Sequence, residues 1–417
     1  MKINHPLYII MLMFALGSCG SEKGERIPPN SQFDDDVAFL KKYSGVIELT
    51  DTEKRSRIAI VPALQARVMT STAGRPENLS YGWINRSFFE AGDTSRHMNA
   101  FGGEERIWLG PEGGQFSIYF PQDSAFTFEN WHTPRLIDLD AYEIVSQTAH
   151  SASFGKSAML TNYSGTKFNI RIAREIKILG AHEAFGLLQI APDTMLSSVA
   201  YQTINELENT GPTAWSRRTG LLSIWLLGMF NPSPGVTMVI PFVEGPAHQM
   251  GPVVNDEYFG KVPPERLKVG KGVIYFKGDG QYRSKIGLSP QRAKDIMGSY
   301  DADSGTLTIV KFSKGEPGAI YVNSKWEIQK NPYSGDVVNA YNDGPPSPGA
   351  KPMGPFYELE SSSPAKELQP GESLRHVQTT FHFQGGQTAL DSLASRLLGT
   401  TVAEINAAFP RSADNEL

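Results

Sequence analysis

Short apolar segments follow one another closely from Val46 to Phe383, with Gly, Pro, Asn and Asp between them. These segments are rich in β-branched and aromatic residues, which favour strands. Residues 199–203 and 377–383 also show the two-residue alternation that is typical of a strand with one buried face. The predicted strands are 46–49, 56–61, 66–72, 115–120, 167–178, 199–207, 237–242, 306–312 and 373–383. The pattern therefore predicts an all-β fold.

Helical spacing is confined to a few short segments. It occurs at 37–43, 388–398 and 402–409, and again at 289–297, where Ser289 stands before Pro290. A serine cap followed by a proline at the first helical position is typical of the start of a helix. We therefore expect a few short helices around the strands.

The N-terminus has the features of a secretory signal peptide. Lys2 precedes an apolar run over 7–16, and Gly17 and Ser18 then lead to Cys19. The run is too short for a spanning helix, which needs about 20 residues. Residues 16–19 resemble the lipobox of bacterial lipoproteins, which implies cleavage before Cys19 and lipid on that cysteine. The alternative is an ordinary secretory peptide in which Cys19 is incidental.

The chain divides into three parts on these grounds. Residues 1–18 are the predicted lipoprotein signal peptide, and 19–36 form a polar, lipidated and flexible tether with a Pro28-Pro29 pair. Residues 37–417 carry no further linker and are expected to form one domain. This organisation predicts a protein of the cell envelope, lipid-anchored on the periplasmic or cell-surface side of a membrane.

Composition excludes some classes of function. The 39 Lys and Arg residues and 44 Asp and Glu residues give a net charge of −5, without the basic stripe that nucleic-acid binding requires. Cys19 is the only cysteine, so no internal disulfide can form. We expect no nucleic acid, cofactor or metal, and a fold that depends on its hydrophobic core.

Two segments resemble a known superfamily. Residues 355–364 (PFYELESSSP), 368–373 (LQPGES) and 376–383 follow the order found at the end of aldose 1-epimerases of the galactose mutarotase-like superfamily. Residues 99–113 (NAFGGEERIWLGPEG) resemble the Gly-Gly loop and the following strand of its divergent members. Weaker similarity extends over 209–241. The resemblance implies a supersandwich of two large antiparallel sheets with a broad groove that binds mono- or oligosaccharide.

The same resemblance places the catalytic base of the epimerases at Glu360. In a strand, Glu358 and Glu360 share one face, so that face is acidic. The two carboxylates either face a sugar or are solvated or paired with arginine, and the sequence leaves both open. If Glu360 serves a ligand, its replacement by Gln is expected to cost little stability.

The chain departs from the epimerases at two histidine positions. Phe101 stands where a histidine precedes the Gly-Gly pair, and an apolar run from Trp225 replaces the segment with the acid histidine. His97 and His248 are the nearest substitutes, although each is better explained as a histidine with a satisfied hydrogen bond. His376 and His382 alternate with polar residues and are predicted on an outer face.

Three further features are candidates for binding. Arg106 and Trp108 share a strand face, and with Glu112 they either clamp a sugar ring or form a buried Arg–Glu pair. Residues 342–344 (NDG) predict a turn. Residues 277–285 form a basic, glycine-rich segment that predicts a hairpin, with a speculative role toward an acidic sugar.

The sequence thus favours a membrane-anchored lipoprotein that binds carbohydrate, with epimerase-like or other sugar-modifying activity left open. A binding module without turnover is favoured by the missing histidines. A non-catalytic structural or assembly lipoprotein is the other alternative, and it would lack a concave polar site.

Overall fold

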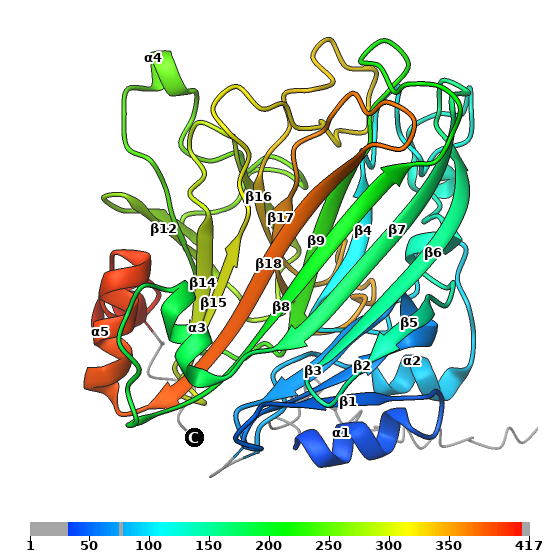
Figure 1. The fold of residues 1–417 in the computed structure, drawn as a ribbon. Helices are drawn as coiled ribbons and strands as arrows, with labels where there is room; N and C mark the ends of the chain where they lie inside the picture. The colour runs from blue at the N-terminus through cyan, green and yellow to red at the C-terminus, as the bar shows by residue number, and fades with distance from the viewer. Residues whose placement is uncertain (1–31, 75–77, 411–417) are drawn as a thin grey trace, which may run out of the picture.

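A computed structural model describes residues 32–74 and 78–410 (Figure 1). Within them the regular structure is mostly antiparallel strand, arranged as a ten-stranded, a five-stranded and a three-stranded sheet. The predicted all-β fold with two large sheets and a few short helices is therefore confirmed. The third sheet was not predicted. The predicted signal peptide, Cys19 and most of the predicted tether lie outside the described residues.

The ten-stranded sheet forms the broad layer at the front of Figure 1. In spatial order its strands are β11 (Leu267–Val269), β12 (Val273–Lys277), β10 (Val236–Pro241), β14 (Ile296–Asp301), β15 (Thr306–Phe312), β18 (Ser373–Gly385), β8 (Leu196–Asn209), β7 (Lys167–Ile178), β6 (Ser151–Thr161) and β5 (Glu143–Gln147). The long strands β7, β8 and β18 pair over most of their length and make its centre.

The five-stranded sheet packs behind it. Its order is β13 (Ser284–Leu288), β16 (Val338–Asn342), β17 (Tyr357–Ser362), β9 (Ser223–Phe230) and β4 (Arg106–Gly110). One face is apolar: Leu226 is buried in a core cluster with Leu207 of β8, and Leu359 in a cluster with Met238 of β10. The opposite face is thereby left for polar side chains.

The N-terminal sheet contains β1 (Ile47–Thr50), β2 (Arg57–Val61) and β3 (Arg67–Thr72). Helix α1 (Phe33–Leu40) packs against it, and α2 (Arg86–Ala91) lies nearby (Figure 1). Phe33 is completely buried in a cluster with Val37 and Ala59. Residues 33–36, which the sequence assigns to the tether, are therefore part of the folded body.

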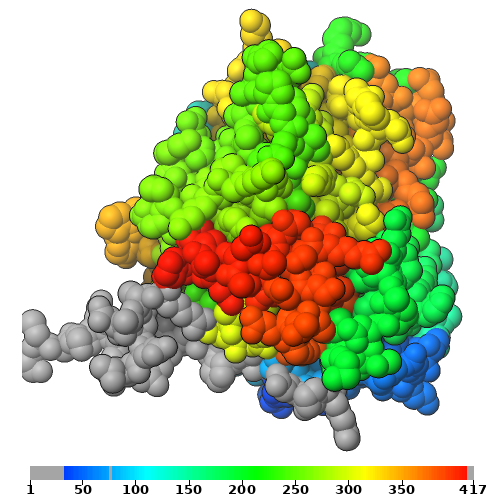
Figure 2. Space-filling model, turned by 90° about the vertical axis from the view of Figure 1, so that its left-hand side faces the viewer, coloured from blue at the N-terminus to red at the C-terminus, as the bar shows by residue number. Residues whose placement is uncertain are grey.

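Helices α3 (Ala181–Leu187), α5 (Gln387–Leu398) and α6 (Val402–Ala408) cover part of the outer face of the ten-stranded sheet. Figure 2 shows the two C-terminal helices, in red, lying across this side of the molecule. A capping box between Thr401 and Glu404 starts α6. Both C-terminal helices were predicted. Among the described residues, no helix is long and apolar enough to cross a membrane.

Two predicted elements are absent. Residues 115–120 are irregular, and their polar groups are held by side chains: the Tyr119 hydroxyl donates to the Leu109 carbonyl at 2.9 Å. The segment 289–297 is a turn that leads into β14. Arg292 holds this turn by donating to the carbonyls of Val243 and Gly251 at 3.0 and 2.8 Å. Tertiary contacts thus override the local helix signal.

Candidate functional site

A cluster of charged and aromatic side chains lies on the face of the five-stranded sheet that points away from the ten-stranded sheet. Strand register explains it, because Glu358 pairs with Tyr341 and Tyr341 with Lys285, and Glu360 lies one row further along, two residues from Glu358. Arg106 lies in the row of Glu360, since both pair with Leu227. We call Arg106, Trp108, Glu112, Trp225, Lys285, Glu358 and Glu360 the Glu360 cluster.

Glu360 is completely buried, and only one of its two carboxylate oxygens accepts hydrogen bonds from the described residues. Its Oε2 accepts hydrogen bonds from Lys285 Nζ and Trp225 Nε1, both at 2.9 Å. Its Oε1 is buried and accepts no hydrogen bond from the described residues. The cation of Lys285 also lies 4.8 Å from the centre of the Trp225 ring. A fixed carboxylate with one vacant acceptor is suited to receiving a hydroxyl group.

Lys285 has several carboxylate neighbours. Burial alone lowers its pKa, but the charges of Glu360 and Glu112 outweigh burial, and the net shift is upward. Lys285 therefore stays protonated at neutral pH. Since Glu360 is half of a buried ion pair, Glu360→Gln is now expected to cost stability.

Arg106 and Glu358 form the second buried ion pair of the cluster. The Arg106 guanidinium also lies 5.2 Å from the centre of the Trp108 ring. Burial raises the pKa of Glu358 to about 7, with Arg106 opposing the rise and Glu360 adding to it. The predicted Arg–carboxylate pair thus exists, but its partner is Glu358 and not Glu112.

Glu112 stands just beyond the end of β4 and is partly buried. Burial raises its pKa to about 7, Lys285 opposes this rise, and Glu360 adds to it. The indoles of Trp326 and Trp131 favour the charged form. At neutral pH this carboxyl group is therefore present in both protonation states, as a general acid or base requires.

Aromatic rings line the cluster. Trp108 meets Trp225 edge to face with centroids 5.5 Å apart, and Trp131 stacks on Trp326 at 5.9 Å. The Tyr258 ring lies 5.7 Å from Lys285 Nζ. The indole N–H of Trp108 is buried without a partner among the described residues, and that of Trp131 faces only the carboxyl group of Glu112. Ring faces combined with vacant donors and acceptors suit a hydroxylated ring compound.

The two candidate histidines are not part of the cluster. His97 Nδ1 donates a hydrogen bond to the Trp131 carbonyl at 2.6 Å, and its ring stacks on Phe128 at 4.2 Å, so it supports the loop at Trp131. His248 is exposed on α4 (Ala247–Met250), which projects from the sheets (Figure 1). The role proposed for His248 as a substitute acid is not supported by this position.

The structure also corrects the prediction for His376 and His382. Both are buried between the two large sheets, where His376 Nε2 lies 2.8 Å from Ser361 Oγ and His382 Nε2 lies 2.9 Å from Glu104 Oε1. Burial lowers the pKa of His376 to about 4, so it is neutral. The alternating polar residues of β18 were predicted to face solvent. They are buried instead, because the inner face of this strand is itself polar.

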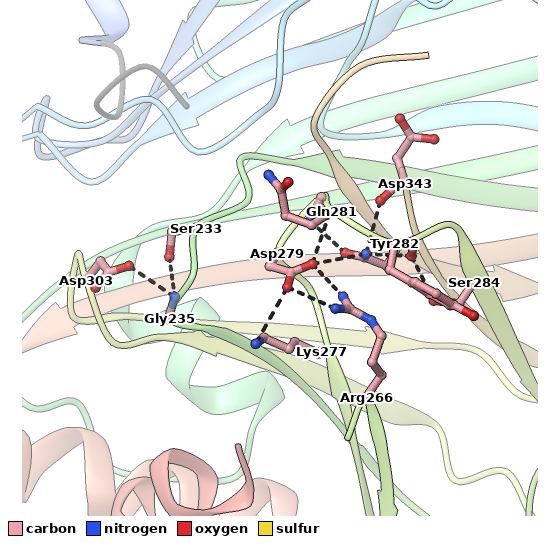
Figure 3. Close-up of polar contacts among 12 residues, drawn as sticks. Ser233, Gly235, Arg266, Lys277, Asp279, Gln281, Tyr282, Ser284, Asp303 and Asp343 are labelled. Carbon is pink, nitrogen blue, oxygen red and sulfur yellow. Dashed lines mark hydrogen bonds and ion pairs between the residues drawn. The ribbon is translucent and has the colours of Figure 1, made fainter. Parts of the chain in front are cut away.

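The basic segment 277–285 is not a hairpin, because β12 and β13 belong to different sheets. Figure 3 shows Asp279 at its centre, bound by Arg266 Nη2 at 2.5 Å and approached by Lys277 Nζ at 3.6 Å. Asn342 donates to the Tyr282 carbonyl at 2.9 Å. The segment is a braced crossover between the sheets, and Asn342 at the end of β16 supports it. The turn predicted at 342–344 is not formed, because Asn342 ends β16 and irregular chain follows.

Three members of this region were missed in the sequence. Lys285 had been grouped with a loop, although its position inside β13 was the available signal. Trp225 was noted only for replacing a histidine, and Tyr258 was not noted. Among the described residues, no group of three or more His, Cys, Asp or Glu side chains is arranged to hold a metal ion.

No curated protein sequence matches the chain. Similar solved structures include a protein provisionally assigned as an aldose 1-epimerase from Escherichia coli K12, with 11% identity, a TM-score of 0.47, and coverage of 81% of this chain and 98% of that chain. The Slr1438 protein of Synechocystis sp. PCC 6803 is 14% identical, with a TM-score of 0.46, over 82% of this chain and 96% of that chain. A galactose mutarotase-like protein from Lactobacillus casei ATCC 334 is 10% identical, with a TM-score of 0.46, over 81% and 100%.

The first and third of these structures carry names from the superfamily that the sequence motifs resemble. One family profile also matches, over residues 31–409, which is most of the chain and all of its sheets. The chain belongs to that family, which is a family of unknown function (DUF6786).

Proposed function

We propose that this protein binds carbohydrate at the Glu360 cluster. The observation that carries the proposal is Glu360 itself, whose Oε2 is fixed by Lys285 and Trp225 while the buried Oε1 has no partner. A carboxylate oriented in this way accepts a sugar hydroxyl without paying further ordering entropy. The indole faces beside it supply the apolar contact that the C–H face of a sugar ring requires.

Access to the cluster is from the side of Lys285 and Glu112. Both keep partial exposure, and the Lys285 side chain is 12% exposed, whereas Glu360 is 0% exposed. A ring that enters here first meets an ammonium group and a carboxyl group, and then the vacant Oε1. The other members of the cluster are buried, at 0% to 6% exposure, which favours a single terminal sugar unit over the middle of a chain.

Acid–base chemistry on the sugar is the second candidate, and Glu112 favours it. In an anomer interconversion, Glu360 takes the proton of the anomeric hydroxyl while an acid protonates the ring oxygen as its bond to the anomeric carbon breaks. The open-chain aldehyde then recloses by the reverse steps, with no net change in protons. Glu112 has the pKa that this acid needs, and it replaces the missing histidine in the proposal.

The test compares four proteins: the parent, Glu360→Gln, Glu112→Gln and the exposed control Glu206→Gln. Titration calorimetry with a panel of mono- and disaccharides is run beside melting curves. We expect Glu360→Gln to weaken binding at least tenfold, because an amide offers hydroxyl groups a weaker acceptor. A parent that binds no sugar, or equal affinities for parent and folded Glu360→Gln, would refute the proposal.

Turnover is measured separately by polarimetry. A rate that falls about 10² to 10⁴-fold in both Glu360→Gln and Glu112→Gln supports the acid–base candidate. If the parent binds sugar but does not accelerate mutarotation, the protein is a binding module without turnover.

We propose further that lipid on Cys19 attaches this site to a membrane. The support is the lipobox-like Leu16-Gly17-Ser18-Cys19 after a short apolar run. Cys19→Ala is expected to move the protein into the soluble fraction and to abolish labelling by a radioactive fatty acid. Unchanged labelling in that variant would refute the anchor.

A further inference from the structure

The face that carries the Glu360 cluster continues beyond it by one row toward the protein surface. Arg283 lies two residues before Lys285, and Asp343 lies two residues after Tyr341, which pairs with Lys285. In a strand, residues two apart point to the same side. Continued past the start of β13 (Ser284–Leu288), this period brings Arg283 to the side of Lys285, and its contact with Phe259, which packs on Tyr341, agrees with that side.

An exposed aromatic ring stands over this outer row. Phe259 is 46% exposed, lies 4.1 Å from the Arg283 guanidinium carbon, and meets Tyr341 edge to face at 6.0 Å. Its neighbour Tyr258 points the other way, toward Lys285, and its hydroxyl is hydrogen-bonded to Asp336 at 2.5 Å. One dipeptide thus borders the inner site with its first ring and presents the second ring outside it.

Arg283 is a cation without an ion-pair partner among the described residues. Asp343, whose charge Arg283 stabilises, has hydrogen bonds on both oxygens, from the Tyr341 hydroxyl at 2.7 Å and the Gly354 amide at 2.9 Å. A guanidinium that stacks on a ring keeps the N–H groups along its edge free, and these groups match a carboxylate with two parallel hydrogen bonds. By contrast, Arg266 already forms an ion pair with Asp279.

We propose that Phe259 and Arg283 form an outer subsite for an acidic sugar unit. The ligand class is an oligosaccharide whose terminal ring lies at the Glu360 cluster and whose next unit carries a carboxylate, as a uronic acid does. Its ring stacks beside Phe259 and its carboxylate pairs with Arg283. The inference rests on the proposed function, because the inner site holds the terminal ring.

The experiment uses matched neutral and uronate disaccharides of the galacto and gluco series, such as galactobiose and digalacturonate, with the full chain. Calorimetry is run on the parent, Arg283→Gln, Arg283→Lys and Phe259→Ala. Arg171→Gln, on the outer face of β7, and Tyr43→Ala, an exposed aromatic beside α1, are the matched controls.

We expect the parent to prefer a uronate over its neutral match by at least tenfold, and Arg283→Gln to abolish that preference while leaving the affinity for the monosaccharide unchanged. Arg283→Lys should restore only part of it, because an ammonium cannot form the paired contact. Phe259→Ala should weaken both disaccharides about tenfold and the monosaccharide little.

Two outcomes separate the proposals. If the parent binds sugars at Glu360 but does not prefer uronates, or if Arg283→Gln keeps the preference, the outer subsite is wrong and the proposed function stands. If Glu360→Gln leaves all sugar binding intact, both fail together. Melting curves for each variant ensure that a loss of binding is not a loss of fold.

Discussion

Lys285 Nζ lies 2.9 Å from Oε2 of Glu360, on the face of the five-stranded sheet opposite to its apolar core. The pair is deeply buried: its carboxylate is fully excluded from solvent and its ammonium group is nearly so. Two buried charges of this kind depend on each other, because either one alone would lose its solvation without compensation.

Removal of the cation should therefore destabilise the fold. Lys285→Met is expected to lower the free energy of unfolding by about 3 to 5 kcal/mol, since it leaves Glu360 buried and unpaired. The double variant Lys285→Met with Glu360→Gln should recover most of this loss. Urea unfolding of the three proteins measures it, and a single variant as stable as the parent would mean that solvent reaches Glu360.

Protonation of Glu112 gives a second prediction. Its pKa is about 7 in the folded protein, and burial is the main cause, whereas an unfolded glutamate titrates near the usual 4.5. The folded state then holds a proton that the unfolded state releases, so the contribution of Glu112 to stability falls as pH rises from about 4.5 to 7 and is constant above.

The measurement is the difference in unfolding free energy between the parent and Glu112→Gln, taken at intervals from pH 4.5 to 8. The parent should lose stability relative to Glu112→Gln as the pH rises to about 7, and the difference should then stay constant. Other titrating groups, such as His376 with its lowered pKa, cancel in this difference. A flat difference would show that Glu112 titrates normally.

A third prediction concerns the indole that orients Glu360. Trp225→Phe removes the N–H donor at 2.9 Å and keeps a ring in its place. Because Lys285 still holds Oε2, stability should fall by only about 1 to 3 kcal/mol, the usual worth of a hydrogen bond to a charged group. Sugar affinity should fall more than in Trp215→Phe, a buried control that packs on Phe168. Equal affinities in the two variants would separate Trp225 from the site.

The last prediction tests where the folded body begins. Phe33→Ala should cost about 3 to 5 kcal/mol, because the ring is fully buried and the Arg57 guanidinium lies 4.6 Å from its centre. Asp35→Ala, which changes an exposed position on the same helix, should be nearly neutral. If both variants unfold alike at the parent's denaturant midpoint, Phe33 belongs to the tether after all.

Much of the fold was predictable because strands with strong periodicity carry their own signal. Residues 167–178 and 306–312 were predicted with the boundaries that β7 and β15 have. The shared face of Glu358 and Glu360 followed from the same two-residue period. These properties depend on neighbours in the chain, which the sequence displays directly.

The remainder depended on which strands become neighbours in space. Lys285 reaches Glu360 only because β13 pairs with β16 and β16 with β17, an order that no local pattern reveals. His376 and His382 were misplaced for the same reason, since a polar face is buried when another polar face covers it. Arg106 and Glu358 are separated by 252 positions, so the sequence could not distinguish their ion pair from one between Arg106 and Glu112.

The start of α1 at Phe33 sets a limit on where the protein can work. With lipid on Cys19, only 33 − 19 = 14 peptide steps separate the anchor from the rigid body. A fully stretched chain covers at most about 3.5 Å per step, or roughly 50 Å in all. The proposed sugar site would thus serve glycans close to the membrane surface, and soluble sugars would have to diffuse into that layer to be bound.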